Sequence, residues 1–196
     1  MNRERLRQIL QDLADHRLSV DEAMDALKIL PFQDLGYAKL DNHRALRDNF
    51  PEVIYCPGKT PQEVAELVAH LHQARQNVIA TRADAETYQA VAQAVPQAEY
   101  DERSRMITVV NNPVSGLGTV AVITAGTADI PVAEEAARSL EIMGATVNRI
   151  YDVGVAGIHR LLERISDLNR AQVLVVVAGM DGALPSVVGG LTSRPV

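Results

Sequence analysis

Apolar residues near the amino terminus recur with the spacing of one helical face, which predicts a helix over residues 3–15. The residues on this face are Leu6, Ile9, Leu10 and Leu13. Ser19 and Glu22 have the spacing of a capping box, which predicts a second helix over residues 20–29. We therefore expect a helical hairpin over residues 1–31.

Residues 32–112 combine short extended stretches with helical ones. A favourable helix start is formed by Thr60, Pro61 and Glu63. Threonine is a good N-cap, proline suits the first helical position, and the glutamate side chain can bond the backbone N–H of the N-cap residue. The apolar face of this helix consists of Val64, Leu67, Val68 and Leu71. The other expected elements are strands over 77–81 and 105–111 and a helix over 85–95. Together these elements predict a small α/β domain.

Residues 111–119 contain a proline and two glycines between two strand-like stretches, which is typical of a domain boundary. Strands and helices alternate regularly after it. The expected strands are 120–123, 146–151 and 173–178, and the expected helices are 131–143, 157–165 and 184–190. The strands are apolar throughout, and we expect Val175–Ala178 to be fully buried. This pattern predicts a three-layer α/β domain over 113–196 with a doubly wound parallel sheet.

The same alternation predicts a further strand where the given sequence stops. Three clear strands are few for a doubly wound sheet. We therefore expect that the sheet is incomplete over 113–196, because the natural protein continues beyond Val196 or because the missing strands come from elsewhere.

The composition is that of a soluble protein with a substantial core. Of 196 residues, 47% are hydrophobic, and no apolar stretch is long enough to span a membrane. A net charge of −6 argues against nucleic-acid binding, which normally requires a basic surface. The amino terminus lacks the apolar core of a signal peptide, and the single cysteine, Cys56, cannot form an internal disulfide. We expect a cytoplasmic protein that binds neither nucleic acid nor membranes.

The first candidate site is the turn that follows strand 120–123. In open parallel sheets, ligands bind beyond the carboxyl ends of the strands. Glycine and hydroxyl residues in this turn would let backbone N–H groups approach a phosphate at the next helix. The candidate binding residues are Thr124, Gly126, Thr127, Ala128 and Asp129. Asp129 is either a ligand-binding residue or the N-cap of the helix that follows, and the two roles can coexist.

The second candidate site follows strand 146–151. Asp152 comes directly after the strand, and His159 and Arg160 lie at the start of the next predicted helix. A histidine can exchange protons near neutral pH, and an arginine can hold a carboxylate or phosphate with two hydrogen bonds. The alternative is a half-exposed pair on a helix surface.

The third candidate site follows strand 173–178. Gly179 and Gly182 allow a ligand to approach the backbone closely. Asp181 would position a proton, a sugar hydroxyl or a metal ion, or else it is another N-cap. None of the three turns matches the dinucleotide-binding or P-loop pattern, and none carries a lysine.

Other polar clusters are less specific. His70 and His72 point to different faces of a helix and make a poor metal pair. Cys56 has no charged residue beside it that would activate the thiol, which favours an inert cysteine over a nucleophile. A denser group could meet an anionic ligand or form a solvated surface. It consists of Asp41, His43, Arg44 and Arg47.

The segments "TAGTADIPVAEEAARSLEIMGATV", "VGVAGIHR" and "VVVAGMDGALPSVVGGLTSRPV" resemble the phosphoribosylaminoimidazole carboxylases of purine synthesis. Nearly the whole chain, including "FQDLGYAKLDNHRALRDNFPEVIYCPGKTPQEV", is more similar to one branch of that fold. This branch is LarB, the pyridinium-3,5-biscarboxylic acid mononucleotide synthases of nickel-pincer cofactor biosynthesis.

The resemblance implies a reaction. Such an enzyme carboxylates the pyridinium ring of nicotinic acid adenine dinucleotide with CO2 or bicarbonate as co-substrate, hydrolyses the phosphoanhydride and releases AMP. The product feeds the nickel cofactor of lactate racemase. The resemblance also implies a homo-octamer, and Mg2+ is a candidate cofactor. It places a cysteine nucleophile beyond Val196, and Cys56 does not match that position.

The resemblance assigns roles to the three turns. Thr127-Ala128-Asp129 matches a Ser-Asp turn that binds ribose and phosphate, with Ala128 in place of the serine. His159-Arg160 matches the second turn of the carboxylases. Gly182-Ala183 matches the third turn but lacks the histidine of the purine enzymes, which favours the pyridinium branch. Asp181 stands where that branch usually has glutamate.

We therefore expect Asp181, His159 and Asp129 to take part in catalysis. The expected substrate-binding residues are Thr124, Gly126, Thr127, Ala128, Asp152, Arg160, Gly179, Gly182, Ala183, Asp41, His43 and Arg44. Two alternatives remain open: a purine-type carboxylase or mutase that acts on aminoimidazole ribonucleotide, and a non-catalytic nucleotide-binding module.

Overall fold

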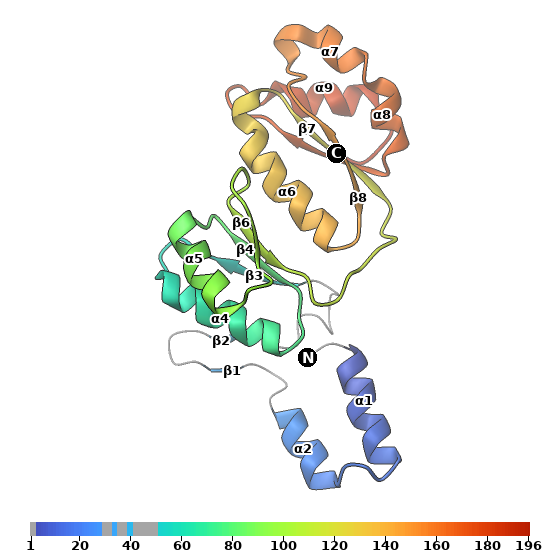
Figure 1. Cartoon of the computed structure of the whole chain (residues 1–196). Coiled ribbons are helices and arrows are strands. Elements are labelled where there is room, and N and C mark those ends of the chain that lie inside the picture. Colours follow the sequence, from blue (N-terminus) through green and yellow to red (C-terminus); the bar gives the residue numbers. More distant parts are fainter. Residues whose placement is uncertain (1–2, 29–32, 35–38, 41–50) are drawn as a thin grey trace. The chain divides into compact units, whose positions relative to one another are not determined.

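The computed structural model describes residues 3–28, 33–34, 39–40 and 51–196. The chain forms two compact units (Figure 1). Unit 1 consists of Met1–Ala80, Ala85–Glu99 and Ile107–Asn112, and unit 2 of Thr81–Asp84, Tyr100–Met106 and Pro113–Val196. One unit boundary thus falls between residues 112 and 113, whereas the helical hairpin shares a unit with most of the small α/β domain.

The two amino-terminal helices form as expected. They are α1 (Arg3–Ala14) and α2 (Val20–Lys28), and they contact each other. The Ser19 Oγ accepts a hydrogen bond from the Glu22 N–H, and the Glu22 carboxylate accepts one of 2.8 Å from the Ser19 N–H, which confirms the capping box. Ile9 and Ala23 are buried, but Leu10 is 51% exposed although its spacing places it on the apolar face.

Unit 1 also contains most of a four-stranded sheet with the order β3-β4-β6-β5. Its strands are β3 (Glu52–Tyr55), β4 (Val78–Thr81), β5 (Glu99–Asp101) and β6 (Met106–Val109). The helices α4 (Pro61–Gln73) and α5 (Ala85–Ala94) contact each other. A separate antiparallel pair consists of β1 (Gln33–Asp34) and β2 (Lys39–Leu40).

The start of α4 has the expected capping box. Thr60 Oγ1 accepts a hydrogen bond from the Glu63 N–H, and the Glu63 carboxylate accepts one of 2.7 Å from the Thr60 N–H. The bond from the Thr60 N–H lowers the pKa of the Glu63 carboxyl because it favours the charged form. All four residues predicted for the apolar face of α4 are buried.

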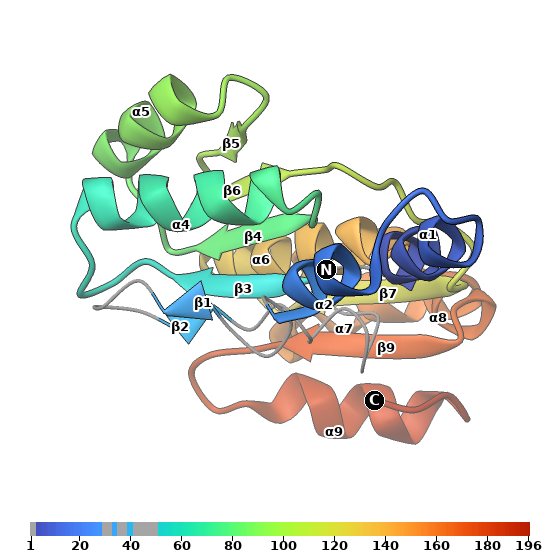
Figure 2. The ribbon, with the colours of Figure 1, turned by 90° about the horizontal axis from the view of Figure 1, so that it is seen from below.

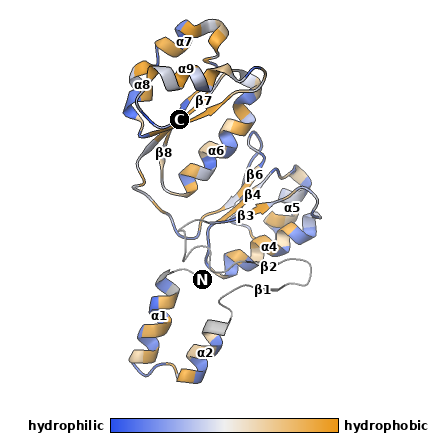
Figure 3. Ribbon diagram, turned by 180° about the vertical axis from the view of Figure 1, so that it is seen from behind, coloured by the Kyte–Doolittle hydropathy of each residue, from blue (hydrophilic) through white to orange (hydrophobic). Residues whose placement is uncertain are grey.

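Unit 2 contains a parallel sheet with the order β8-β7-β9. Its strands are β7 (Thr119–Thr124), β8 (Thr146–Ile150) and β9 (Val173–Val177). The helices are η1 (Thr127–Asp129), α6 (Ile130–Ile142), η2 (Val155–Gly157), α7 (Ile158–Leu162), α8 (Ile165–Arg170) and α9 (Ala183–Leu191). In Figure 3 the helix α6 shows both hydrophobic and hydrophilic residues, as expected for a helix that covers a sheet.

Alternate residues of β7 face different helices. Val122 packs with Ala133 and Ala137 of α6. Ala121 and Ile123 belong to a second cluster on the other face, which includes Leu161 of α7, Leu168 of α8, and Leu184 and Val188 of α9. Figures 1 and 2 show the ribbons of α6 and α9 on either side of this sheet. The predicted three-layer, doubly wound arrangement is therefore confirmed.

Three details differ from the expectation. The helix expected over 157–165 is the shorter α7, which ends at Leu162, and a second helix, α8, was not expected. Between them the Arg164 N–H donates to the Leu161 carbonyl in a tight turn, and the Arg164 guanidinium bonds Asp167. The strand β5 was not expected, since it has only three residues and no apolar pattern. Residues 175–178 are half-buried rather than fully buried, because β9 lies at the end of the strand order.

Candidate functional site

Three loops meet at the carboxyl edge of the parallel sheet. We call them loop 1 (residues 125–129, after β7), loop 2 (residues 151–157, after β8) and loop 3 (residues 178–182, after β9). β7 is the middle strand, so loop 1 lies between the other two. Loop 1 leads to α6 on one face of the sheet, and loop 3 leads to α9 on the other face. The ends of β7 and β9 are therefore a topological switch point, where open α/β sheets bind their ligands.

Asp129 connects the two loops at this switch point. One carboxylate oxygen accepts a hydrogen bond of 2.9 Å from the Gly126 N–H within loop 1. The other accepts a hydrogen bond of 3.0 Å from the Gly179 N–H in loop 3. Asp129 precedes α6 in the N-cap position, but its side chain makes no capping bond to that helix. Asp129 is therefore the N-cap residue by position, but its carboxylate bonds Gly126 and Gly179 instead of capping α6.

Thr124 lies inside the protein and joins loop 1 to loop 2. Its side chain is fully buried, and its hydroxyl accepts a hydrogen bond of 3.0 Å from the Asp152 N–H. Its carbonyl accepts a bond of 3.0 Å from the Val153 N–H. The structure thus places Thr124 behind the loops, where it positions them without presenting its hydroxyl to solvent.

Gly154 is required by the close approach of loops 1 and 2. A Cβ atom at this position would lie 2.7 Å from the carbonyl oxygen of Ala125. This is well inside van der Waals contact, and the obstructing atom belongs to the backbone. A side chain at Gly154 would therefore push the two loops apart.

Arg160 and Asp152 form an ion pair across loop 2. Arg160 donates a hydrogen bond of 2.7 Å to the Asp152 carboxylate, and Asp152 itself adopts a positive φ of 58°. Both side chains are more than a third exposed, at 40% for Arg160 and 48% for Asp152. The guanidinium therefore remains accessible to an anionic ligand. His159 beside it is exposed.

Loop 3 closes as a tight turn. The Gly182 N–H donates a hydrogen bond of 2.9 Å to the Gly179 carbonyl, and Gly182 has a left-handed φ of 61°. Gly182, and not Asp181, occupies the N-cap position of α9, so the N-cap interpretation of Asp181 is wrong. The exposed Asp181 carboxylate instead accepts a long hydrogen bond of 3.4 Å from the Ala183 N–H.

Direct contacts thus join some of the predicted residues and not others. Asp129 bonds Gly126 and Gly179, and Asp152 bonds Arg160. Thr127 and Ala128 are exposed on loop 1, and Ala183 is half-buried at the start of α9. The predicted residues Asp41, His43 and Arg44 lie outside the described residues.

A cluster that the sequence analysis missed supports loop 2 from the side of α6. Arg149 of β8 forms hydrogen bonds with the carboxylates of Glu134 and Glu141, both on α6. The Tyr151 hydroxyl donates a hydrogen bond of 3.0 Å to Glu134. Burial and this bond raise the pKa of Tyr151 to about 12. The seven-residue spacing of Glu134 and Glu141 puts both on one helix face, but it does not show that Arg149 and Tyr151 face them.

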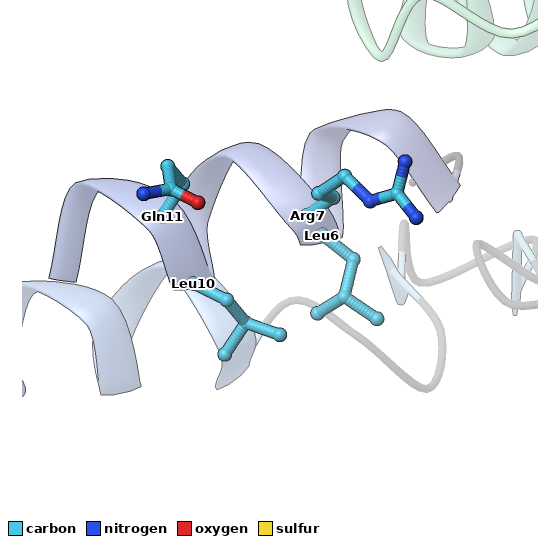
Figure 4. A pocket seen from close by; sticks show the side chains of 4 residues that line it. All are labelled: Leu6, Arg7, Leu10 and Gln11. Carbon is cyan, nitrogen blue, oxygen red and sulfur yellow. The ribbon is translucent and has the colours of Figure 1, made fainter. Parts of the chain in front are cut away.

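The other titratable candidates within the described residues belong to unit 1. Cys56 is buried in unit 1, at 5% exposed, and His70 and His72 lie on α4. Within the described residues, no group of three or more His, Cys, Asp or Glu side chains is arranged to hold a metal ion. A shallow hollow on α1 is lined by Leu6, Arg7, Leu10 and Gln11 (Figure 4), none of which is a predicted site residue. In the part of the chain that is described, no helix has the length and apolar character to cross a membrane.

Comparison with known proteins places the chain in a family. Residues 32–112 match the family model of the LarB/PurE-like N-terminal domain. An uncharacterized protein of Methanocaldococcus jannaschii is 36% identical over 203 aligned residues, which cover 97% of this chain and 78% of that protein. The N5-carboxyaminoimidazole ribonucleotide mutase of the same organism is 34% identical over 80 residues, which cover 39% of this chain and 48% of the mutase. The chain therefore belongs to the family of proteins that carry a LarB/PurE-like N-terminal domain.

Proposed function

We propose that this protein carboxylates the pyridinium ring of nicotinic acid adenine dinucleotide and hydrolyses its phosphoanhydride, releasing AMP and pyridinium-3,5-biscarboxylic acid mononucleotide for a nickel-pincer cofactor. The observation that carries this proposal is the junction of loops 1 and 3 by Asp129 at the switch point of a parallel sheet. Membership of the LarB/PurE-like family supports it.

The proposed ligand has phosphates, ribose hydroxyls and a cationic ring, and the loops offer a group for each. The exposed guanidinium of Arg160 suits a phosphate, since it can form two parallel charge-assisted hydrogen bonds. The Asp129 oxygens each accept one backbone N–H and retain lone pairs for ribose hydroxyls. The exposed carboxylate of Asp181 suits the positive ring or a further hydroxyl.

The chemistry also requires a nucleophile and a proton acceptor. A pyridinium ring is too electron-poor to attack CO2, but addition of a thiolate would make it enamine-like and able to form the new carbon–carbon bond. Loss of the ring proton and expulsion of the thiolate would then restore aromaticity. His159 or Asp181 would accept that proton. Among the described residues we assign no nucleophile, because Cys56, the one cysteine of the sequence, is buried.

Mg2+ remains a prediction. The described residues form no metal site of three or more protein ligands, and we route no step through a metal. Mg2+ is often held by one or two carboxylates together with substrate phosphates, so the activity assay should include it.

The test is an assay of the full-length gene product with nicotinic acid adenine dinucleotide, isotope-labelled bicarbonate and Mg2+. We expect AMP and a labelled mononucleotide heavier by CO2, both detected by mass spectrometry. Release of AMP without incorporation of label would limit the activity to hydrolysis, and absence of both products would contradict the proposal. Light scattering of the same preparation would test the expected octamer.

A second candidate function is a purine-type reaction on aminoimidazole ribonucleotide. The 34% identity to the N5-carboxyaminoimidazole ribonucleotide mutase favours it. The absence of a histidine after Gly182 argues against it. Rescue of a purine auxotroph would support this function. Nucleotide binding without turnover of either substrate would instead support a non-catalytic module.

A further inference from the structure

Met180 is an apolar side chain presented at the tip of loop 3. Its exposed fraction is 108% of the reference value, so nothing in the described part of the chain covers it. It lies between Gly179, whose N–H is bonded to Asp129, and Asp181. Met180 is therefore placed beside the switch point.

The base of this turn is held at both ends. The Gly179 N–H donates a hydrogen bond of 3.0 Å to Asp129, and the Gly182 N–H donates one of 2.9 Å to the Gly179 carbonyl. These bonds fix the backbone on either side of Met180. The exposed methionine therefore projects from an anchored turn rather than from a free segment.

The backbone of Met180 is also unusual. Its φ is 42°, and of the six described non-glycine residues with a positive φ it is the only apolar one. A side chain in this region costs free energy that glycine avoids, and such residues concentrate at ligand sites. Met24, by contrast, is 54% exposed on the helix α2, where its backbone is ordinary. An exposed apolar side chain is common and needs no explanation. The exposed side chain of Met180 does need one, because the residue also has a positive φ and lies beside the switch point.

We propose that Met180 is a specificity-determining residue whose thioether side chain covers one face of the flat heteroaromatic ring of the bound nucleotide. Methionine is flexible and polarizable, and its sulfur makes favourable contacts with aromatic rings. The inference rests on the proposed function only in requiring a nucleotide that carries such a ring. The shared ribose and phosphate groups are left to Asp129 and Arg160.

The direct test is NMR of the protein with methyl-labelled methionine. The sequence has five methionines. Met180→Leu identifies the Met180 methyl signal by its loss. On addition of nicotinic acid mononucleotide, nicotinic acid adenine dinucleotide or aminoimidazole ribonucleotide, we expect the ring current to shift this signal upfield, while the Met24 signal stays in place. Ribose 5-phosphate, which lacks a ring, should leave the Met180 signal near its free position.

Binding measurements provide a second readout. We expect Met180→Ala to weaken the binding of the ring-bearing nucleotides about twofold to tenfold and to leave ribose 5-phosphate unaffected. Met180→Leu should retain most of the affinity, and Met24→Ala should change nothing. Equal weakening of all ligands, or an unmoved Met180 signal at saturation, would overturn the inference.

The outcomes separate this inference from the proposed function. If nicotinic acid adenine dinucleotide binds normally to Met180→Ala, the role of Met180 fails and the proposed substrate stands. If only aminoimidazole ribonucleotide binds and Met180 responds to it, the proposed substrate fails and the role of Met180 stands. Failure of the wild-type chain to bind any ring-bearing nucleotide would overturn both.

Discussion

The Asp129 carboxylate accepts a hydrogen bond of 3.0 Å from the backbone N–H of Gly179, which lies fifty residues further along the chain. This bond joins the loop after the middle strand β7 to the loop after its neighbour β9. The second Asp129 oxygen holds the Gly126 N–H. One side chain therefore sets the spacing of two loops at the edge where open α/β sheets bind ligands.

We expect Asp129→Ala to release loop 3 from loop 1. Two charge-assisted hydrogen bonds are lost from a half-buried carboxylate, so the free energy of unfolding should fall by about 1–3 kcal/mol. Amide hydrogen exchange at Gly126 and Gly179 should become faster. Chemical denaturation and exchange mass spectrometry measure the two effects.

Asp181→Ala is the matched control for this change. Asp181 is exposed and accepts only a bond of 3.4 Å from the Ala183 N–H. We expect its removal to leave the unfolding free energy and the exchange of Gly179 unchanged. Equal effects of the two substitutions would show that Asp129 has no special role in joining the loops.

We expect Gly154→Ala to be destabilising. The new methyl group would meet the Ala125 carbonyl at 2.7 Å, and forced backbone shifts of this kind cost roughly 1–3 kcal/mol. Gly189→Ala is the control, because a Cβ there meets nothing within 4 Å and the residue lies within α9. That change should stabilise the protein by about 0.5–1 kcal/mol, the usual gain of alanine over glycine in a helix. Thermal unfolding of both variants tests whether loops 1 and 2 are in contact.

Arg160→Ala should separate binding from stability. The Arg160–Asp152 pair is exposed on both sides, and such pairs contribute only about 0–1 kcal/mol to folding. Loss of a guanidinium that binds phosphate should weaken nucleotide binding about tenfold or more. Arg160→Lys keeps the charge but not the paired geometry, so we expect an intermediate affinity. Calorimetric titration with nicotinic acid mononucleotide would reveal the difference, and unchanged affinity in both variants would remove Arg160 from the site.

The raised pKa of Tyr151 predicts a dependence of stability on alkaline pH. Burial and the bond to Glu134 favour the neutral phenol in the folded protein, where its pKa is about 12 rather than 10.0. The contribution of Tyr151 to the free energy of unfolding is therefore fully present below pH 10.0 and is lost as the pH rises through about 12. A phenolate that titrates late should appear in the ultraviolet spectrum of the wild type and be missing from Tyr151→Phe. A late transition that persists in the variant would assign it to another tyrosine.

Local sequence signals were sufficient for most of the elements. The capping boxes at Ser19 and Thr60, the glycine after α6 and the apolar strands of the parallel sheet all appear where the pattern predicts them. These signals work because capping and amphipathic burial involve residues close together in the chain. The helix α8 was missed because six residues with a single buried leucine are too few to show a period.

The candidate site was predictable in its residues but not in their contacts. The pattern of strands placed loops 1, 2 and 3 at one edge, and Asp129 was recognised as either a cap or a ligand. Its partner in loop 3, Gly179, is distant in sequence and donates only a backbone N–H. Because nearly every residue has such a group, the sequence does not indicate which one bonds Asp129. The cluster of Arg149, Glu134 and Glu141 was missed for the related reason that helix and strand must pack before these charges meet.

The sequence by itself determined the fold class of this protein, the edge of the sheet at which polar residues collect, and its membership of the LarB/PurE-like family. Only the tertiary structure decided which of those residues form hydrogen bonds with one another and which are buried or exposed. The Asp129 carboxylate joins two loops, Thr124 is buried behind them, and Met180 is exposed at the tip of loop 3. The physical reason is that hydrophobic periodicity involves residues close together in the sequence. Hydrogen bonds between loops instead depend on the packing of strands that lie far apart in the chain.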